Sequence, residues 1–304
     1  MVSLAANYEG VFMFDKISNS WALAKASMNV LRSDKELLIF PLISGIGAIL
    51  VMITFLVPFI ASGILQAMAE SSTRRGDIDG ATWVPGLILM FLFYVVTYFV
   101  SFYCNTALVG AALIRLRGGD PTISDGFRIA NSRIGNILGY AVISATVGMI
   151  LRAISERGGI IGSIVAGLLG FGWTVATFLV VPILALEEVG PIDAVKRSVE
   201  LLKQTWGENL VANFGIGAVF GWISAGLIFL VFVPLMAIGA SMESAGIMIF
   251  SVIVLVVGLV IIGLFSSALT GIYQAALYRY ALDGEIGGDF DAATIQQAFK
   301  PKRG

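Results

Sequence analysis

The sequence predicts an all-α integral membrane protein with six transmembrane helices. Hydrophobic residues make up 58% of the 304 residues and charged residues only 13%, whereas a soluble domain carries about 25% charged residues. The charged residues also gather in short segments that separate six long uncharged runs. Runs of this length are typical of membrane spans, because a helix of about 20 residues crosses the hydrocarbon core.

The six runs define the predicted spans in chain order. They are residues 37–69, 80–114, 134–151, 158–186, 209–242 and 244–278. The third run is the shortest, and Arg152 to Arg157 after it are expected to form a tight loop. Glu243 alone separates the last two runs, so the chain is expected to turn back near Gly239–Gly246.

An amphipathic helix precedes each pair of spans and is predicted to lie flat on the membrane surface. In the clearest case Pro191 occupies the first helical turn. An apolar stripe then recurs at helical spacing, opposite charged residues, and consists of Ile192, Val195, Val199, Leu202 and Trp206. A second such helix is expected after Thr122 and a third from Trp21.

This alternation predicts three repeats of an amphipathic helix followed by a helical hairpin. The repeats cover about residues 19–116, 117–188 and 189–282, within one membrane domain over 19–282. Residues 1–18 are expected to form a cytoplasmic arm and 283–304 a cytoplasmic tail with a short helix. The repeat is suggested by matching joints: Ala111–Arg115 and Ala275–Arg279 both read Ala-Ala-Leu-x-Arg, and Thr122–Arg128 resembles Thr294–Lys300.

The distribution of cations predicts the orientation. Six spans place both termini on one side, and the segments on that side hold fifteen lysines and arginines, against four in the opposite loops. Cytoplasmic loops carry the excess of positive charge in membrane proteins. Both termini are therefore expected in the cytoplasm, with the chain in the cytoplasmic membrane.

Candidate functional residues fall into two groups. No ionisable residue lies inside the six runs, which argues against a proton-coupled pump. Neutral polar residues remain as candidates for a pathway or cavity, although hydrogen bonding between helices is the alternative: Asn105, Thr106, Asn213, Ser267 and Gln274. Basic residues near the span ends are candidates for lipid-headgroup contacts, with topology signalling as the alternative: Arg115, Arg128, Lys196, Arg197 and Arg279.

Other residues favour structure over chemistry. The chain has no histidine and a single cysteine, Cys104, so His-based metal sites and Cys–His nucleophiles are excluded and no metal or cofactor is predicted. The near-neutral net charge argues against nucleic acid. Glycine pairs such as Gly158 and Gly162 are expected to pack helices within the chain, and Gly118–Gly119 is expected to form a flexible joint.

The N-terminal stretch Ser20 to Ser27, followed by Val30 to Pro41, resembles the opening of an uncharacterised family of prokaryotic polytopic membrane proteins. The repeated helix-and-hairpin layout is also distantly similar to the membrane domain of glycerophosphodiester phosphodiesterases. No segment resembles the soluble catalytic domain of those enzymes, so their activity is not implied. What the resemblance implies is an integral membrane module without assigned chemistry.

The sequence thus favours a non-enzymatic membrane protein that interacts with lipid or scaffolds a membrane assembly. The alternative is a channel or facilitative transporter with a neutral polar pathway. Membrane lipids are the predicted partners, together with a homo-oligomer or another membrane protein.

Overall fold

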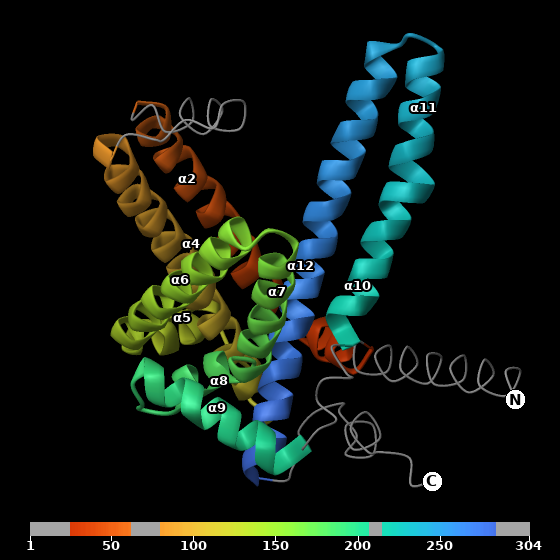
Figure 1. Ribbon diagram of the computed structural model, residues 1–304. Coiled ribbons are helices and arrows are strands. Elements are labelled where there is room, and N and C mark those ends of the chain that lie inside the picture. Colours follow the sequence, from red (N-terminus) through yellow and green to blue (C-terminus); the bar gives the residue numbers. More distant parts are fainter. Residues whose placement is uncertain (1–24, 62–79, 207–214, 284–304) are drawn as a thin grey trace, which may run out of the picture. The chain divides into compact units, whose positions relative to one another are not determined.

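The computed structural model describes residues 25–61, 80–206 and 215–283, and all regular structure in them is helical (Figure 1). Several predicted features lie outside these residues: the arm over 1–18, the helix start at Trp21, the end of the first run, Asn213 and the tail after Asp283. The chain divides into two compact units. The first unit comprises Met1–Pro41, Ala111–Ile123 and Glu200–Gly304, and the second comprises Leu42–Gly110 and Ser124–Val199.

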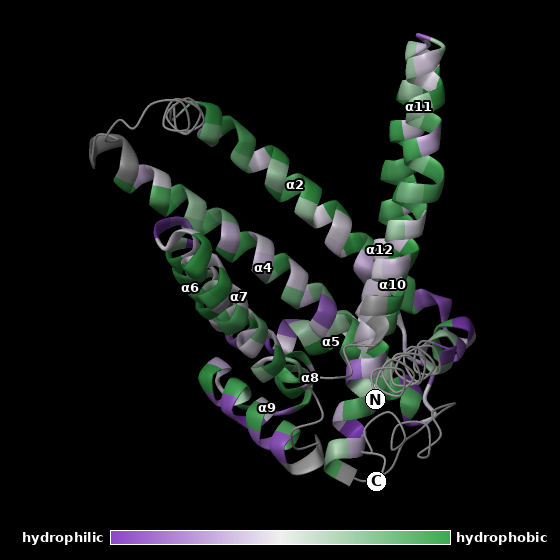
Figure 2. Ribbon diagram, turned by 45° about the vertical axis from the view of Figure 1, so that its right-hand side comes forward, coloured by the Kyte–Doolittle hydropathy of each residue, from purple (hydrophilic) through white to green (hydrophobic). Residues whose placement is uncertain are grey.

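Six helices in the described residues are long and apolar enough to cross a membrane, as predicted. They are Lys35–Ala61, Val84–Leu116, Ile134–Arg157, Gly159–Leu186, Val219–Ser241 and Ala245–Leu282. Figure 2 shows that hydrophobic residues dominate these helices, whereas hydrophilic residues gather at their ends. The class of a multi-pass helical membrane protein is therefore confirmed.

In the second unit, helices α2 (Ile39–Ala61) and α4 (Gly80–Leu116) run side by side. Phe55 and Phe93 pack edge to face with ring centroids 5.5 Å apart. Gly47 brings the two backbones close, since a Cβ at this position would lie 2.7 Å from the side chain of Val100. Small residues allow this kind of close helix contact in membranes.

The short helix α5 (Ile123–Ser132) packs against α4 in the same unit. The ring of Phe127 stacks on that of Tyr103 at 5.8 Å, and the Tyr103 hydroxyl donates a hydrogen bond of 2.8 Å to Oδ1 of Asn131. Ala130 is buried. Phe127 and Ala130, which belong to the apolar face predicted for this helix, therefore face protein.

The second unit continues through the hairpin of α6 (Ile134–Arg157) and α7 (Gly159–Ala176). The tight loop predicted over Arg152 to Arg157 is wrong, because these residues form the last turns of α6 and the chain turns at Gly158. Gly159 has φ of +56°, a conformation that favours glycine. A Cβ at Gly162 would lie 2.4 Å from the Ile154 carbonyl oxygen, so the glycine packing predicted within the chain is confirmed here.

After α7, a break over residues 177–179 leads into α8 (Val180–Leu186), and α9 (Pro191–Trp206) follows. Pro191 begins α9 as predicted. Its ring packs against α6, where a Cβ at Gly139 would lie 2.9 Å from Pro191 Cγ. The side chain of Trp206 lies outside the described residues.

The first unit contains helical residues 25–33, the 3₁₀ turn η1 (Lys35–Leu38), and a long hairpin. One arm of the hairpin is α10 (Gly215–Gly226), the π-helical segment η3 (Leu227–Phe232) and α11 (Val233–Ser241), and the other is α12 (Ala245–Asp283). The turn between them lies at residues 242–244, as predicted. The Ser244 N–H donates to the Gly239 carbonyl at 2.9 Å, and Glu243 takes a φ of +49°.

Both long helices α4 and α12 have one exposed end and one buried end. Residues 107–113 of α4 and 268–278 of α12 are largely buried, whereas apolar side chains such as Val84, Ile88, Ile249 and Val256 are exposed toward the opposite ends. Exposed apolar surface of this extent requires an apolar surrounding. The exposed ends are therefore the parts that suit hydrocarbon.

Candidate functional site

The predicted pathway residues are divided between the two units. Asn105 and Thr106 lie on α4 in the second unit, and Ser267 and Gln274 lie on α12 in the first. Thr106 is completely buried, and its hydroxyl has no hydrogen-bond partner among the described residues. Asn105, Ser267 and Gln274 are half-buried. A side chain without access to solvent does not border an open water path, so Thr106 suits helix packing better than a pore.

The end of α4 is an ordered cap, where the sequence suggested a flexible joint at Gly118–Gly119. The Gly119 N–H donates to the Ile114 carbonyl at 3.0 Å and the Gly118 N–H to the Arg115 carbonyl at 2.9 Å. Gly118 has φ of +85°. These are the two bonds and the left-handed glycine of a Schellman motif, which satisfies the last carbonyls of a helix.

Two of the predicted lipid-contacting arginines stabilise this cap in the first unit. Arg115 donates to the Gly119 carbonyl at 3.4 Å and pairs with Asp120 at 3.5 Å. Arg279, from the end of α12, donates through Nη1 to the Leu116 carbonyl. A cation at a helix C-terminus stabilises the exposed carbonyl dipoles. With 31% of its side chain exposed, Arg115 is better placed to bind backbone than to reach headgroups.

Asp34 is a buried carboxyl group near this cap that sequence reasoning missed. It caps η1, where its Oδ1 accepts a hydrogen bond of 3.2 Å from the Glu36 N–H. Its Oδ2 is buried without a partner among the described residues. Burial raises the pKa of Asp34, although the Glu36 hydrogen bond and the charge of Arg115 act to lower it.

The other three cations predicted to contact lipid lie in the second unit, one on α5 and two on α9, and each pairs with a carboxylate. Arg128 pairs with Asp125 at 3.3 Å and is 76% exposed. Lys196 pairs with Asp193 at 2.9 Å and is 67% exposed. Arg197 pairs with Glu187 at 3.6 Å and is more covered. Arg128 and Lys196 are thus the cations most able to meet a membrane surface.

Helix α9 presents three different faces. Ala194 and Ser198 are fully buried, and the Ser198 hydroxyl accepts a hydrogen bond of 3.1 Å from the Leu179 N–H. Of the predicted apolar stripe, Ile192 is exposed, Val195 and Val199 are half-buried, and Leu202 is buried. The charged residues occupy the remaining face (Figure 2). This order suits a helix at a membrane surface that packs on its own protein.

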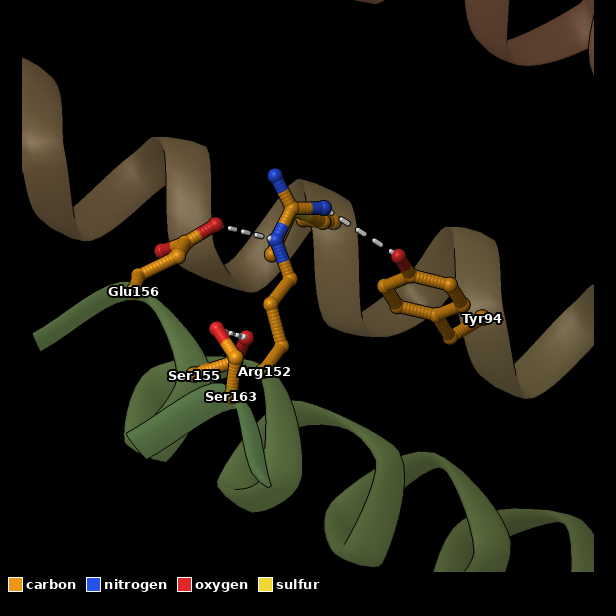
Figure 3. A network of polar contacts seen from close by, with 6 residues as sticks. Tyr94, Arg152, Ser155, Glu156 and Ser163 are labelled. Carbon is orange, nitrogen blue, oxygen red and sulfur yellow. Dashed lines mark hydrogen bonds and ion pairs between the residues drawn. The ribbon is translucent and has the colours of Figure 1, made fainter. Parts of the chain in front are cut away.

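At the opposite end of the α6–α7 hairpin, Arg152 lies inside a spanning helix. The sequence had placed every ionisable residue outside the spans, and α6 extends that span to Arg157. Arg152 donates through Nε to Glu156 at 2.6 Å, and through Nη1 to the Tyr94 hydroxyl at 3.2 Å and to Met90 Sδ at 3.7 Å (Figure 3). The uncharged run ends at the first charge, so hydropathy alone does not indicate that the helix continues to Arg157.

The six spans, the interfacial placement of charge and the helical fold define a multi-pass helical membrane protein. Residues 84–288, from α4 to just past α12, match the model of a family of unknown function, DUF6159, and the chain belongs to that family. No curated protein matches the chain. The expected membership of an uncharacterised family is thus confirmed, whereas the likeness to the phosphodiesterase membrane domain and the prokaryotic origin stay predictions.

Proposed function

We propose that this protein is a non-enzymatic membrane module that binds lipid at the membrane surface through α5 and α9. The observation that carries the proposal is the three-faced character of α9. Its buried face fixes the helix on the protein, its half-exposed valines and exposed Ile192 suit the acyl boundary, and its charged face suits water and headgroups.

The carboxylates near these helices support a non-catalytic role. Asp125, Glu187, Glu188 and Asp193 each pair with a neighbouring cation. A carboxylate that serves as a general base must reach a substrate proton instead. We therefore assign these groups to holding and orienting the cations.

Orientation and repeat are further parts of the proposal. The ends of the spans next to α5 and α9 face the cytoplasm, on the strength of the cation bias. The order of elements supports three repeats, because residues 25–33, α5 and α9 each precede a helical hairpin. The repeats do not coincide with the compact units, because α4 and α9 are each divided between the two units.

Lipid selectivity measured by electron paramagnetic resonance tests the proposal. The purified protein is reconstituted with spin-labelled phosphatidylglycerol or phosphatidylcholine, and the immobilised fraction of each lipid is compared. The double variant Arg128→Gln, Lys196→Gln is expected to lose preference for the anionic lipid, by at most about fivefold for each cation, since a basic residue near an anionic surface contributes about 1 kcal/mol.

Arg115→Gln is the matched control. Because Arg115 binds the cap of α4, its loss is expected to lower the thermal stability without changing lipid preference. An unchanged preference in the double variant would contradict the proposal. Lipid preference lost only in the Arg115 variant would move the headgroup site to the end of α4.

A further inference from the structure

We propose that Arg152 binds the phosphate group of a phospholipid at the turn of the α6–α7 hairpin. The inference rests on the proposed contact of this protein with lipid, and it adds a headgroup site at the end of the hairpin away from α5 and α9. All the residues that form it belong to the second unit.

The guanidinium of Arg152 is fixed on two sides and free on the third. Nε is held by Glu156 and Nη1 by Tyr94 and Met90. Among the described residues Nη2 makes no hydrogen bond or ion pair, and it points away from both Glu156 and Tyr94 in Figure 3. A guanidinium offers five N–H donors in a planar fork that matches phosphate. The Arg152 side chain is 38% exposed.

Tyr94 provides a second donor in a fixed position. Its ring stacks on Tyr98, with centroids 6.2 Å apart, and packs against Phe93 at 5.9 Å. The hydroxyl accepts from Arg152, so its own proton remains available to an anionic oxygen. The hydroxyls of Ser155 and Ser163 form a hydrogen bond of 3.1 Å with each other beside the arginine, which leaves one hydroxyl proton available as a donor at the same turn.

The surroundings of the turn suit a lipid better than a soluble ion. Ile160 and Ile161, which follow the turn, are exposed, and so are Val84 and Ile88 on α4. Helix α4 extends about 20 Å from Tyr94 back to Gly80, at about 1.5 Å per residue. Arg152 therefore meets α4 part-way along the helix, at Tyr94 and Met90.

A cation within a spanning helix is costly unless it finds an anion. Glu156 supplies one negative charge, but the exposed Arg157 restores a net positive charge to the turn. The turn thus presents a positive charge and exposed apolar side chains. A phospholipid suits both, because its phosphate meets the guanidinium while its acyl chains cover the exposed isoleucines. A free phosphate ion satisfies only the first.

Thermal unfolding of the delipidated protein in detergent tests the site. Three probes are titrated: phosphatidylglycerol, diacylglycerol, which lacks the phosphate, and inorganic phosphate, which lacks the chains. Only the phospholipid is expected to raise the melting temperature at low concentration. Arg152→Gln is expected to weaken its apparent affinity about tenfold, as for loss of a charge-assisted hydrogen bond, and Tyr94→Phe less.

Arg32→Gln, at an exposed position of the other compact unit, is the control and is expected to change the affinity little. If Arg152→Gln does not fold, Arg152→Lys replaces it in the same titration. This variant keeps the charge and is expected to bind the phospholipid more weakly than the wild type. Equal affinity of wild type and Arg152→Gln, or equal stabilisation by diacylglycerol or inorganic phosphate, would overturn the proposal. The proposed lipid contact of α5 and α9 is tested independently, by the lipid preference of the Arg128→Gln, Lys196→Gln double variant.

Discussion

Ser198 shows how a single hydroxyl joins three helices. It is completely buried on α9 and accepts a hydrogen bond from the Leu179 N–H, at the break between α7 and α8. Ser198→Ala leaves that N–H buried without a partner, which is expected to cost about 1–3 kcal/mol of unfolding free energy. Thermal unfolding in detergent measures the loss. Ser124→Ala, at an exposed position of α5, should change stability by less than about 0.5 kcal/mol.

Asp34 gives a pH dependence with a definite sign. Because burial raises its pKa, the folded state binds the proton more tightly than the unfolded chain does. The stability that this carboxyl contributes is complete below about pH 4 and is lost as the pH rises through the raised pKa.

Asp34→Asn removes this loss and keeps a side-chain acceptor for the Glu36 N–H, since asparagine is also a good N-cap. The variant is expected to melt at a higher temperature than the wild type near pH 7 and to show a flatter pH profile above about pH 4. A lower melting temperature near pH 7 would show instead that the carboxylate is stabilised by Arg115.

The exposed cations of α5 and α9 follow directly from the amphipathic pattern, so Arg128 and Lys196 were predictable as surface groups. The burial of Asp34 was not, because the segment Ser33 to Glu36 reads as an ordinary polar linker. Its burial depends on tertiary contacts that bring η1 next to α12. The roles of Arg115 and Arg279 likewise depend on where the α4 carbonyls lie.

At the scale of elements, hydropathy predicted the existence of each span and the turn at Glu243. It could not predict that α6 continues through Arg157, because a charged residue ends an uncharged run even where the helix persists. The break at residues 177–179 and the π-helical segment η3 were also missed. Both change hydrogen bonding along a helix without changing its hydrophobicity.

Two glycines of α7 test how the α6–α7 turn closes. A Cβ at Gly162 would meet the Ile154 carbonyl oxygen, whereas Gly167 has open space around its Cβ position. Gly162→Ala is therefore expected to force the backbones apart and to cost more than about 1 kcal/mol. Gly167→Ala is expected to be neutral or to stabilise by up to about 1 kcal/mol through helix propensity. Equal effects in thermal unfolding would contradict the close packing at Gly162.

At the scale of the whole molecule, the sequence orders the spans but does not group them. The first unit combines three separate stretches, with the ends of α4 and α12 joined through Arg279 and the Leu116 carbonyl. Hydropathy assigns each span an environment, and this assignment is the same whichever neighbour it packs against. Grouping the spans needs the small residues and polar contacts that only the folded chain brings together.

The number of spans between two positions predicts whether they lie on the same side of the membrane. This prediction does not depend on which membrane holds the protein. Asp120 follows α4 and is 97% exposed, and Glu243 at the α11–α12 turn is also exposed. Three spans separate these positions, namely Ile134–Arg157, Gly159–Leu186 and Val219–Ser241. In a Cys104→Ala background, Asp120→Cys and Glu243→Cys are therefore expected to react with a membrane-impermeant maleimide from opposite sides of sealed vesicles. Arg157→Cys, at the α6–α7 turn, should react from the same side as Glu243→Cys. Labelling of positions 120 and 243 from one side would contradict the prediction, because it would mean that one of the three intervening spans does not cross the membrane.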